Sequence, residues 1–297
     1  MAFKLTDLRY AGDDLRWYDV ELPWTENDHS RYVRTNRNAC RIRSKPRRRG
    51  SDLGFLRELQ PLHGVQIDRG PRRDDVVFQV PDLVCLVLAN RGVTPFNPEN
   101  LKNLAQLVTD SRPDIERVSE CRSLRFLRVA RWEGDNLTFV GDARPIEYLR
   151  VEGRGQEFTF DGLDGPEGLR VCWIDSMTPR SLSGLQAQPG LQYLYVDSPR
   201  RAPKRTLDLG PVGQLASLEW LNLQRCGRLA SLAPLRNLQS LQGVSLGASD
   251  VADGDMTPLI DLPESASVSF ADMPHYSHTL DEIVDLRASK FGKKKAP

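Results

Sequence analysis

The 297-residue sequence predicts an α/β-type repeat solenoid, in which short strands alternate with tight turns and stack on one another. Three observations predict this class. The apolar pattern LxxLxL recurs along most of the chain, its copies begin at similar intervals, and the segments before several copies carry leucines spaced by three. Neither half of such a unit can bury its apolar side alone, so we expect neighbouring units to complete a shared core.

The copies of the pattern extend from residue 62 to residue 246, with Ile, Val or Cys allowed at each apolar position. They are Leu62/Val65/Ile67, Leu83/Leu86/Leu88, Leu124/Leu127/Val129, Ile146/Leu149/Val151, Leu169/Cys172/Ile174, Leu191/Leu194/Val196, Leu218/Leu221/Leu223 and Leu241/Val244/Leu246. Their starting positions differ by 21, 41, 22, 23, 22, 27 and 23 residues. The interval of 41 spans nearly two units, and Leu104 and Leu107 in its middle fit a poorly matched one. The registry between residues 89 and 123 therefore stays open.

The two halves of each unit have different periods. The fourth and sixth positions alternate with their neighbours, as in a strand with one buried face. Before the strand, spacing by three (Leu229, Leu232, Leu235) is typical of 3₁₀ or similar turns. The alternative is a leucine-rich helical repeat, but glycines and prolines such as Gly162 and Pro234 would interrupt its helices.

These segments resemble the leucine-rich-repeat family, specifically its 22-residue bacterial, internalin-like type, and residues 215–246 show it best. The resemblance covers roughly residues 51–270. It implies a curved array with a parallel β-sheet on the concave side and 3₁₀ or irregular turns on the convex side. The family usually places Asn or Cys nine residues into the unit, bonded to the adjoining loop. Cys226 fits, but the equivalent positions elsewhere hold Gly70, Arg91, Trp132, Arg154, Met177, Pro199 and Ser249.

The two ends of the chain are expected to cover the array, which we place at residues 51–274. Residues 1–50 form an N-terminal cap, with a hairpin built from residues 3–10 and 16–22 and a basic segment at 31–49. Residues 275–297 form a short C-terminal capping helix and a Lys-rich tail. Thr279 and Glu282 resemble a capping box, and Leu280, Ile283 and Val284 give the helix an apolar side.

Composition and motifs exclude several classes of function. Lys+Arg 41 against Asp+Glu 40 leaves a net charge of +1, so no global field favours nucleic acid or membranes. No apolar run is long enough for a signal peptide or a membrane span, so we expect a soluble, cytoplasmic protein. The five scattered cysteines argue against a disulfide framework or a zinc site. His275 and His278 have no clear third metal ligand beside them. Since HExxH, GxSxG and GxxxxGK[ST] motifs are missing, we expect neither an enzyme nor a cofactor.

The basic segment offers one alternative function. Residues 31–49 carry nine positive charges and no acidic residue. Such a run can contact phosphate, act as a flexible linker or fold against the acidic remainder of the chain. The alternative is therefore a nucleic-acid-associated protein whose basic patch comprises Arg41, Arg43, Lys45, Arg47, Arg48 and Arg49.

The side chains between the buried positions predict the main site. The third, fifth and seventh positions of each unit leave the strands on the exposed side, where aromatic residues collect with charges beside them. Tyr, Trp and Arg dominate interface energetics, although adjacent rings can also merely pack on one another. We expect non-enzymatic binding of another protein on the concave face, including an inhibitor or immunity-type role. The candidate partner-binding residues are Phe126, Arg128, Tyr148, Arg150, Trp173, Asp175, Tyr193, Tyr195, Asp197, Trp220 and Asn222.

Overall fold

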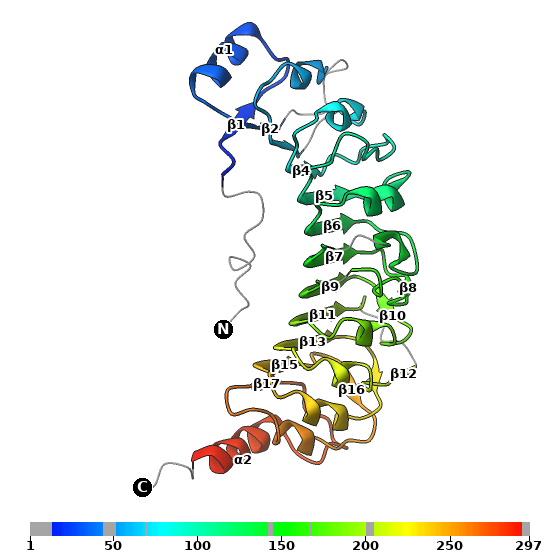
Figure 1. Ribbon diagram of the computed structural model, residues 1–297. Coiled ribbons are helices and arrows are strands. Elements are labelled where there is room, and N and C mark those ends of the chain that lie inside the picture. The colour runs from blue at the N-terminus through cyan, green and yellow to red at the C-terminus, as the bar shows by residue number, and fades with distance from the viewer. Residues whose placement is uncertain are drawn as a thin grey trace. The chain divides into compact units, whose positions relative to one another are not determined.

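The structure is a computed structural model that describes residues 14–43, 52–68, 71–141, 145–166, 168–199 and 205–292. The chain forms two compact units. The first unit contains residues 1–132 and 139–147, and the second contains residues 133–138 and 148–297. Figure 1 shows the strands, turns and helices of the two units.

The first unit holds a parallel sheet whose strands pair in chain order. They are β1 (Trp17–Val20), β2 (Ala39–Ile42), β3 (Gly64–Ile67), β4 (Cys85–Leu88), β5 (Gln106–Asp110) and β6 (Phe126–Ala130). The pairing aligns Val65 with Leu86 and places both in the core, as the repeat pattern predicts. The domain boundaries remain a prediction, although parallel pairing starts at β1, before residue 51.

Strand β5 explains why two consecutive copies of the pattern, at Leu83 and Leu124, begin 41 residues apart. Leu107 pairs with Leu86 on one side and with Leu127 on the other, so a full unit lies between the fourth and sixth strands. Its sixth position is Thr109, which is 1% exposed and donates a hydrogen bond from its hydroxyl to the Asp110 carbonyl. A buried polar side chain interrupted the apolar pattern without interrupting the repeat.

The N-terminal part of the first unit differs from the predicted hairpin. Of the two predicted arms, 16–22 contains β1, which pairs in parallel with β2, and 3–10 lies outside the described residues. A helix, α1 (Glu26–Arg34), follows β1 and begins with a capping box between Thr25 and Asp28. Tyr32 anchors this helix, because its ring is buried and its hydroxyl donates to the Pro61 carbonyl at 2.7 Å. The basic segment thus begins within a folded helix.

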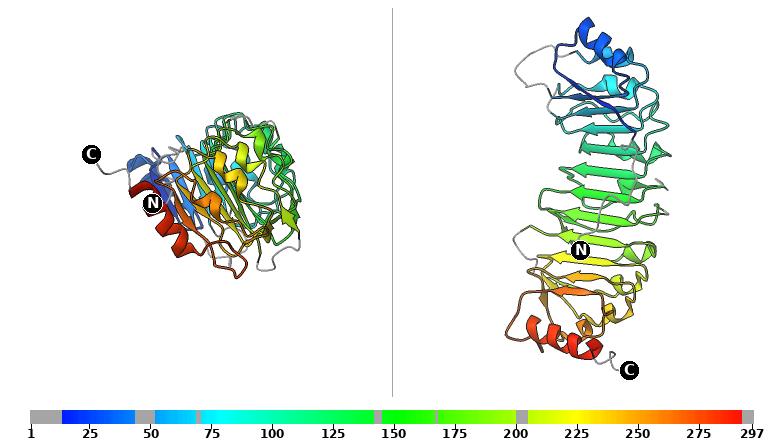
Figure 2. Two further views of the ribbon diagram at one scale, coloured as in Figure 1. Left: turned by 90° about the horizontal axis from the view of Figure 1, so that it is seen from below. Right: turned by 90° about the vertical axis from the view of Figure 1, so that its left-hand side faces the viewer.

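The second unit holds a parallel sheet of the same kind. Its strands pair in the order β7 (Tyr148–Glu152), β9 (Val171–Asp175), β11 (Tyr193–Asp197), β13 (Trp220–Gln224), β15 (Gly243–Ser245) and β17 (Ser267–Ser269). Figure 2 shows these strands lying side by side. We call the side of this sheet that carries the third, fifth and seventh pattern positions the strand face of the second unit.

Turns on the other side of each sheet carry the leucines spaced by three. The 3₁₀ turns are η2 (Gly54–Arg57), η3 (Asp75–Gln79), η4 (Ile115–Glu120), η5 (Thr138–Val140), η6 (Leu185–Ala187), η7 (Val212–Gln214), η8 (Ala233–Asn237) and η9 (Thr257–Leu259). Around η8, Leu232, Leu235 and Leu238 are all fully buried, which confirms the predicted turn half of the unit.

Short strands, which the pattern did not predict, pair in the second unit away from the strand face (Figure 1). They are β8 (Glu157–Phe158) with β10 (Thr178–Pro179), and β12 (Thr206–Leu207), β14 (Arg228–Leu229) and β16 (Asp250–Val251).

A C-terminal helix, α2 (Leu280–Gly292), follows the last strand of the second unit. Its capping box is formed as predicted, because the Thr279 amide donates to Glu282 and the Glu282 amide donates to Thr279. The buried Arg287 donates hydrogen bonds to the backbone carbonyls of residues 259, 262, 263, 264 and 266. These carbonyls belong to η9 and the loop that follows it, so the guanidinium links α2 to the last turn of the array. None of the helices in the described residues is long and apolar enough to cross a membrane.

Candidate functional site

The strand face of the second unit has the register that the sequence predicts. Leu194 and Leu221 are 0% and 1% exposed, whereas Tyr193, Tyr195 and Trp220 beside them are half-buried. Strand pairing aligns Tyr193 with Trp220 and Tyr195 with Asn222. The leucines therefore point into the core, and the rings lie on the opposite side of the sheet.

An aromatic stack with a guanidinium on it occupies one half of this face. The ring of Trp173 on β9 stacks on Tyr195 of β11, with centroids 4.2 Å apart and planes at 28°, and lies 5.8 Å from Tyr193. From β7, the guanidinium of Arg150 lies over the Trp173 ring at 4.7 Å. Because β9 lies between β7 and β11, Trp173 is held by a cation–π contact and a ring stack together.

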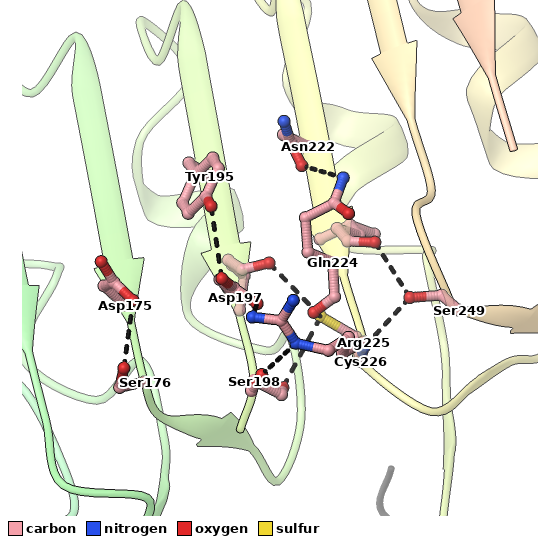
Figure 3. Close-up of polar contacts among 12 residues, drawn as sticks. Asp175, Ser176, Tyr195, Asp197, Ser198, Asn222, Gln224, Arg225, Cys226 and Ser249 are labelled. Atoms are coloured by element: carbon pink, nitrogen blue, oxygen red, sulfur yellow. Dashed lines mark hydrogen bonds and ion pairs between the residues drawn. The ribbon is translucent and has the colours of Figure 1, made fainter. Parts of the chain in front are cut away.

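Carboxylates at the seventh position accompany the stack. Arg150 pairs with Glu152 at 2.9 Å and with Asp175 at 3.3 Å. Asp197 pairs with Arg225, and the Tyr195 hydroxyl donates to Asp197 at 3.4 Å (Figure 3). Arginine side chains of the unit itself therefore pair with the carboxylates in this half of the face.

Burial changes the pKa of two of these groups. Partial burial raises the pKa of the Tyr195 phenol to about 12, and the neighbouring carboxylate of Asp197 adds to the rise. Burial also raises the pKa of Asp197, which the Arg225 guanidinium opposes. Desolvation is thus the leading influence on both groups.

A hollow beside Trp220 occupies the other half of the strand face. Its volume is ≈ 150 Å³, and it is lined by Tyr193, Trp220, Leu221, Asn222, Gly243, Val244, Ser245, Ser267 and Ser269. These residues come from β11, β13, β15 and β17, and none of them is charged. Gly243 has a direct role, because a Cβ at this position would overlap the six-membered ring of Trp220.

A chain of amide and hydroxyl groups lies at the edge of the hollow. The side-chain amide of Gln224 donates to Asn222 Oδ1 at 2.6 Å and to Ser245 Oγ at 2.9 Å (Figure 3 shows the first bond). Gly247 leaves space for the Gln224 amide, which a Cβ there would overlap, and its φ of +48° lies in the left-handed region. Gly243 and Gly247 thus leave the space that the side chains of Trp220 and Gln224 on β13 occupy.

Other predicted site residues lie elsewhere. Tyr148 occupies the third position of β7 but is only 3% exposed, so its expected exposure is corrected: neighbouring groups cover the ring. Phe126 and Arg128 are half-buried on β6, which belongs to the first unit. The structure therefore brings together the predicted residues from Arg150 to Asn222.

The described part of the basic segment is folded and paired with acids. Arg41 on β2 lies over the Trp17 ring at 5.1 Å and pairs with Asp19 at 3.6 Å. Arg43 lies 3.9 Å from Asp19 and 3.7 Å from Asp68. The other predicted members of the patch, Lys45, Arg47, Arg48 and Arg49, lie outside the described residues. Of the three interpretations of this segment, the contacts of Arg41 and Arg43 match folding against acidic residues.

The loop after β13 has a side-chain ladder that the sequence revealed only in part. Cys226 is buried, with its sulfur 3.6 Å from the Val196 carbonyl. One unit further along, Ser249 accepts from the Cys226 amide at 3.0 Å and donates to the Leu223 carbonyl at 2.9 Å (Figure 3). Ser249 departs from the Asn or Cys that is usual in the family, but its hydroxyl both accepts and donates and so bonds the adjoining loop as those residues would.

The first unit contains a buried ion pair that the sequence pattern does not indicate. The side chains of Asp74 and Arg112 are both fully buried, with Arg112 Nη1 3.2 Å from each Asp74 oxygen. The Asn90 amide donates to Asp74 at 3.0 Å, and Arg112 Nε donates to Thr109 at 3.1 Å. Spacing along the chain gives no sign of this pair, because the two residues lie 38 positions apart.

The thiols of the described residues and the His275 side chain have partners or surroundings that suit a structural role. All five cysteines are free and buried, and burial raises the pKa of each to about 12. His275 lies 3.0 Å from the Val251 carbonyl and 3.1 Å from Asp250. Across the part of the chain that the structure describes, no three His, Cys, Asp or Glu side chains are grouped to hold a metal ion.

The parallel strands, the 3₁₀ turns opposite them and the leucine core together define the leucine-rich-repeat fold. A solved structure of this fold is similar to the chain. A leucine-rich-repeat protein of Leptospira interrogans has a TM-score of 0.54 at 16% identity, covering 87% of this chain and 74% of that chain. The predicted fold is therefore confirmed.

Two internalins from Listeria monocytogenes are also similar. InlF is 16% identical over 79% of each chain, and internalin C2 is 19% identical over 60% of this chain and 77% of that chain; each has a TM-score of 0.48. No protein-family model matches the chain. Among curated proteins there is no match either.

Proposed function

We propose that the strand face of the second unit binds another protein reversibly and carries out no chemistry. The observation that carries this proposal is the half-buried group of Trp173, Tyr193, Tyr195 and Trp220 on one side of a parallel sheet. Aromatic residues with arginine beside them make up most of the strongly contributing positions in protein interfaces. The leucine-rich-repeat fold, typically a protein-binding module, supports the same class of function.

Mutual packing of the rings is the alternative explanation for this group. It accounts for Trp173, which contacts Tyr193 and Tyr195 directly. It does not account for Trp220, whose ring lies against Gly243 and borders an open hollow. Among the ring pairs of the described residues, none includes Trp220. A contact surface explains this residue better than core packing does.

A sharper version of the proposal is an inhibitor or immunity-type protein that masks a partner's active surface. The experiment is affinity capture with the full chain as bait and Trp173→Ala and Trp220→Ala as matched baits. One stoichiometric partner that is lost with both variants supports the proposal. Only weak, heterogeneous binding that is the same for all three baits would contradict it.

Nucleic-acid binding by residues 31–49 has less support. Arg41 and Arg43 already face Asp19 and Asp68, so their charges are partly compensated within the first unit. Binding to heparin that weakens with salt, survives Trp173→Ala and requires Arg47–Arg49 would favour this function instead.

A further inference from the structure

We infer that the hollow beside Trp220 is the subsite for one asparagine or glutamine side chain presented by the protein partner. The inference rests on the proposed function and specifies the chemistry of its contact. The hollow provides ≈ 150 Å³, room for a single amide- or ring-sized group. The occupant is therefore one side chain.

The contact between Trp220 and Gly243 determines the shape of the hollow. The ring lies against the backbone of Gly243, where any side chain would displace it. The Cε3–Cζ3 edge of the ring thus meets the sheet, and the indole borders the hollow. A planar group such as a side-chain amide can pack against this ring.

The direction of the hydrogen bonds at the edge of the hollow sets its polarity. Gln224 donates to both Asn222 Oδ1 and Ser245 Oγ. Asn222 Nδ2 points away from Gln224 (Figure 3). Among the described residues, none accepts a hydrogen bond from Asn222 Nδ2 or from the Ser245 hydroxyl. The hollow therefore offers donors, and its occupant supplies a carbonyl oxygen.

Charge argues against an ionised occupant. None of the nine lining residues is charged, so a carboxylate entering the hollow would lose hydration without gaining a cation. A cation would find no carboxylate among the lining residues to pair with. An uncharged amide satisfies all of these conditions, since its carbonyl accepts from Asn222 and its nitrogen can donate to the Ser267 or Ser269 hydroxyl oxygens.

The decisive variant is Asn222→Asp. It keeps an oxygen that accepts from Gln224 and replaces the two outward N–H donors by an acceptor. Asn237→Asp, at an exposed position in η8 away from the strand face, makes the same change in charge and serves as the control. Thermal melts that match the wild type confirm that both variants fold.

The test selects displayed 12-residue random peptides on the immobilised full chain. We expect enrichment of Asn or Gln at one position, at least tenfold weaker binding of the selected peptides to Asn222→Asp, and unchanged binding to Asn237→Asp. Loss with Trp173→Ala and Trp220→Ala but not with Asn222→Asp would overturn the subsite and leave the binding face in place. Peptide binding that is unchanged by Trp173→Ala, Trp220→Ala and Asn222→Asp would overturn both proposals. Enrichment of charged residues, or saturable binding of methyl glycosides in place of peptides, would overturn the amide inference.

Discussion

The indole ring of Trp220 on β13 lies against Gly243 on β15, in the space that a Cβ at position 243 would fill. The pair is in register, so each residue occupies the third position of its own unit. A large ring on one strand is thus matched to the smallest residue on the next. This relationship lets the ring approach the backbone of the next strand, and the hollow lies beside it.

Gly243→Ala should push the Trp220 ring away from the sheet. Forcing a methyl group into packed space costs about 1–3 kcal/mol, and rotation of the ring would keep the loss near the lower end. We expect a changed tryptophan emission spectrum, a lower midpoint of urea unfolding and weaker partner binding. Gly190→Ala is the control, because a Cβ there meets no atom within 4 Å. Equal behaviour of the two variants would contradict the seating of Trp220 on Gly243.

Trp220→Ala and Leu221→Ala test the register of β13 by opposite effects. Leu221 is 1% exposed, so removing its side chain should cost ~2–5 kcal/mol in the free energy of unfolding. Trp220 lies on the strand face, so its removal should weaken partner binding by ~2 kcal/mol or more with a smaller loss of stability. Urea unfolding and quantitative pull-down measure the two effects. Reversed phenotypes would show that the assignment of the two faces is wrong.

Asp74→Ala in the first unit should be strongly destabilising. It would leave the fully buried guanidinium of Arg112 without its carboxylate, which typically costs about 3–5 kcal/mol. The double variant Asp74→Ala/Arg112→Met should recover much of this loss, because it removes both charges. Urea unfolding of the wild type, both single variants and the double variant measures the coupling. Additive losses would mean that the two side chains do not interact in the folded protein.

Much of the fold could be predicted because the repeat pattern reports directly on burial. Leu194 and Leu221 point inward because a strand alternates its two faces, and sequence spacing is enough to show it. The unit around β5 did not match the apolar pattern because its sixth position is Thr109. This polar residue is buried, and its hydroxyl donates to the neighbouring Asp110 carbonyl. Helix α1 was missed although Thr25 and Asp28 form a capping box. The helix buries only Tyr32, which gives it a weak apolar pattern.

The candidate site could be predicted less completely. Register alone places Trp173, Tyr195 and Trp220 on one face, and the structure agrees. Exposure depends on what neighbouring side chains cover, so the burial of Tyr148 could not be derived from its position. The hollow is equally invisible in the sequence, because it lies where the Trp220 ring meets Gly243 of the following unit.

The raised pKa of Tyr195 predicts a loss of stability at alkaline pH. Burial, followed by the charge of Asp197, raises this pKa from 10.0 to about 12, so the folded state holds its phenol proton more tightly than the unfolded state. The resulting contribution to stability is complete below pH 10 and is lost as the pH rises toward 12, since the unfolded chain ionises first. Tyr195→Phe lacks this dependence. The stability of the wild type relative to the variant should therefore fall between these two pH values in urea unfolding.

Absorbance at 295 nm measures ionisation of tyrosine phenols and should detect Tyr195 directly. We expect an ionisation step near pH 12 in the wild type that is absent in Tyr195→Phe. Tyr32, whose pKa is also raised by burial, titrates in both proteins and cancels in the difference. A phenol that ionises near pH 10 in the folded wild type, or a stability difference that is constant with pH, would mean that solvent reaches Tyr195 freely. In that case Trp173 and Asp197 would not enclose it, and the stack on the strand face would be looser than its 4.2 Å ring separation implies.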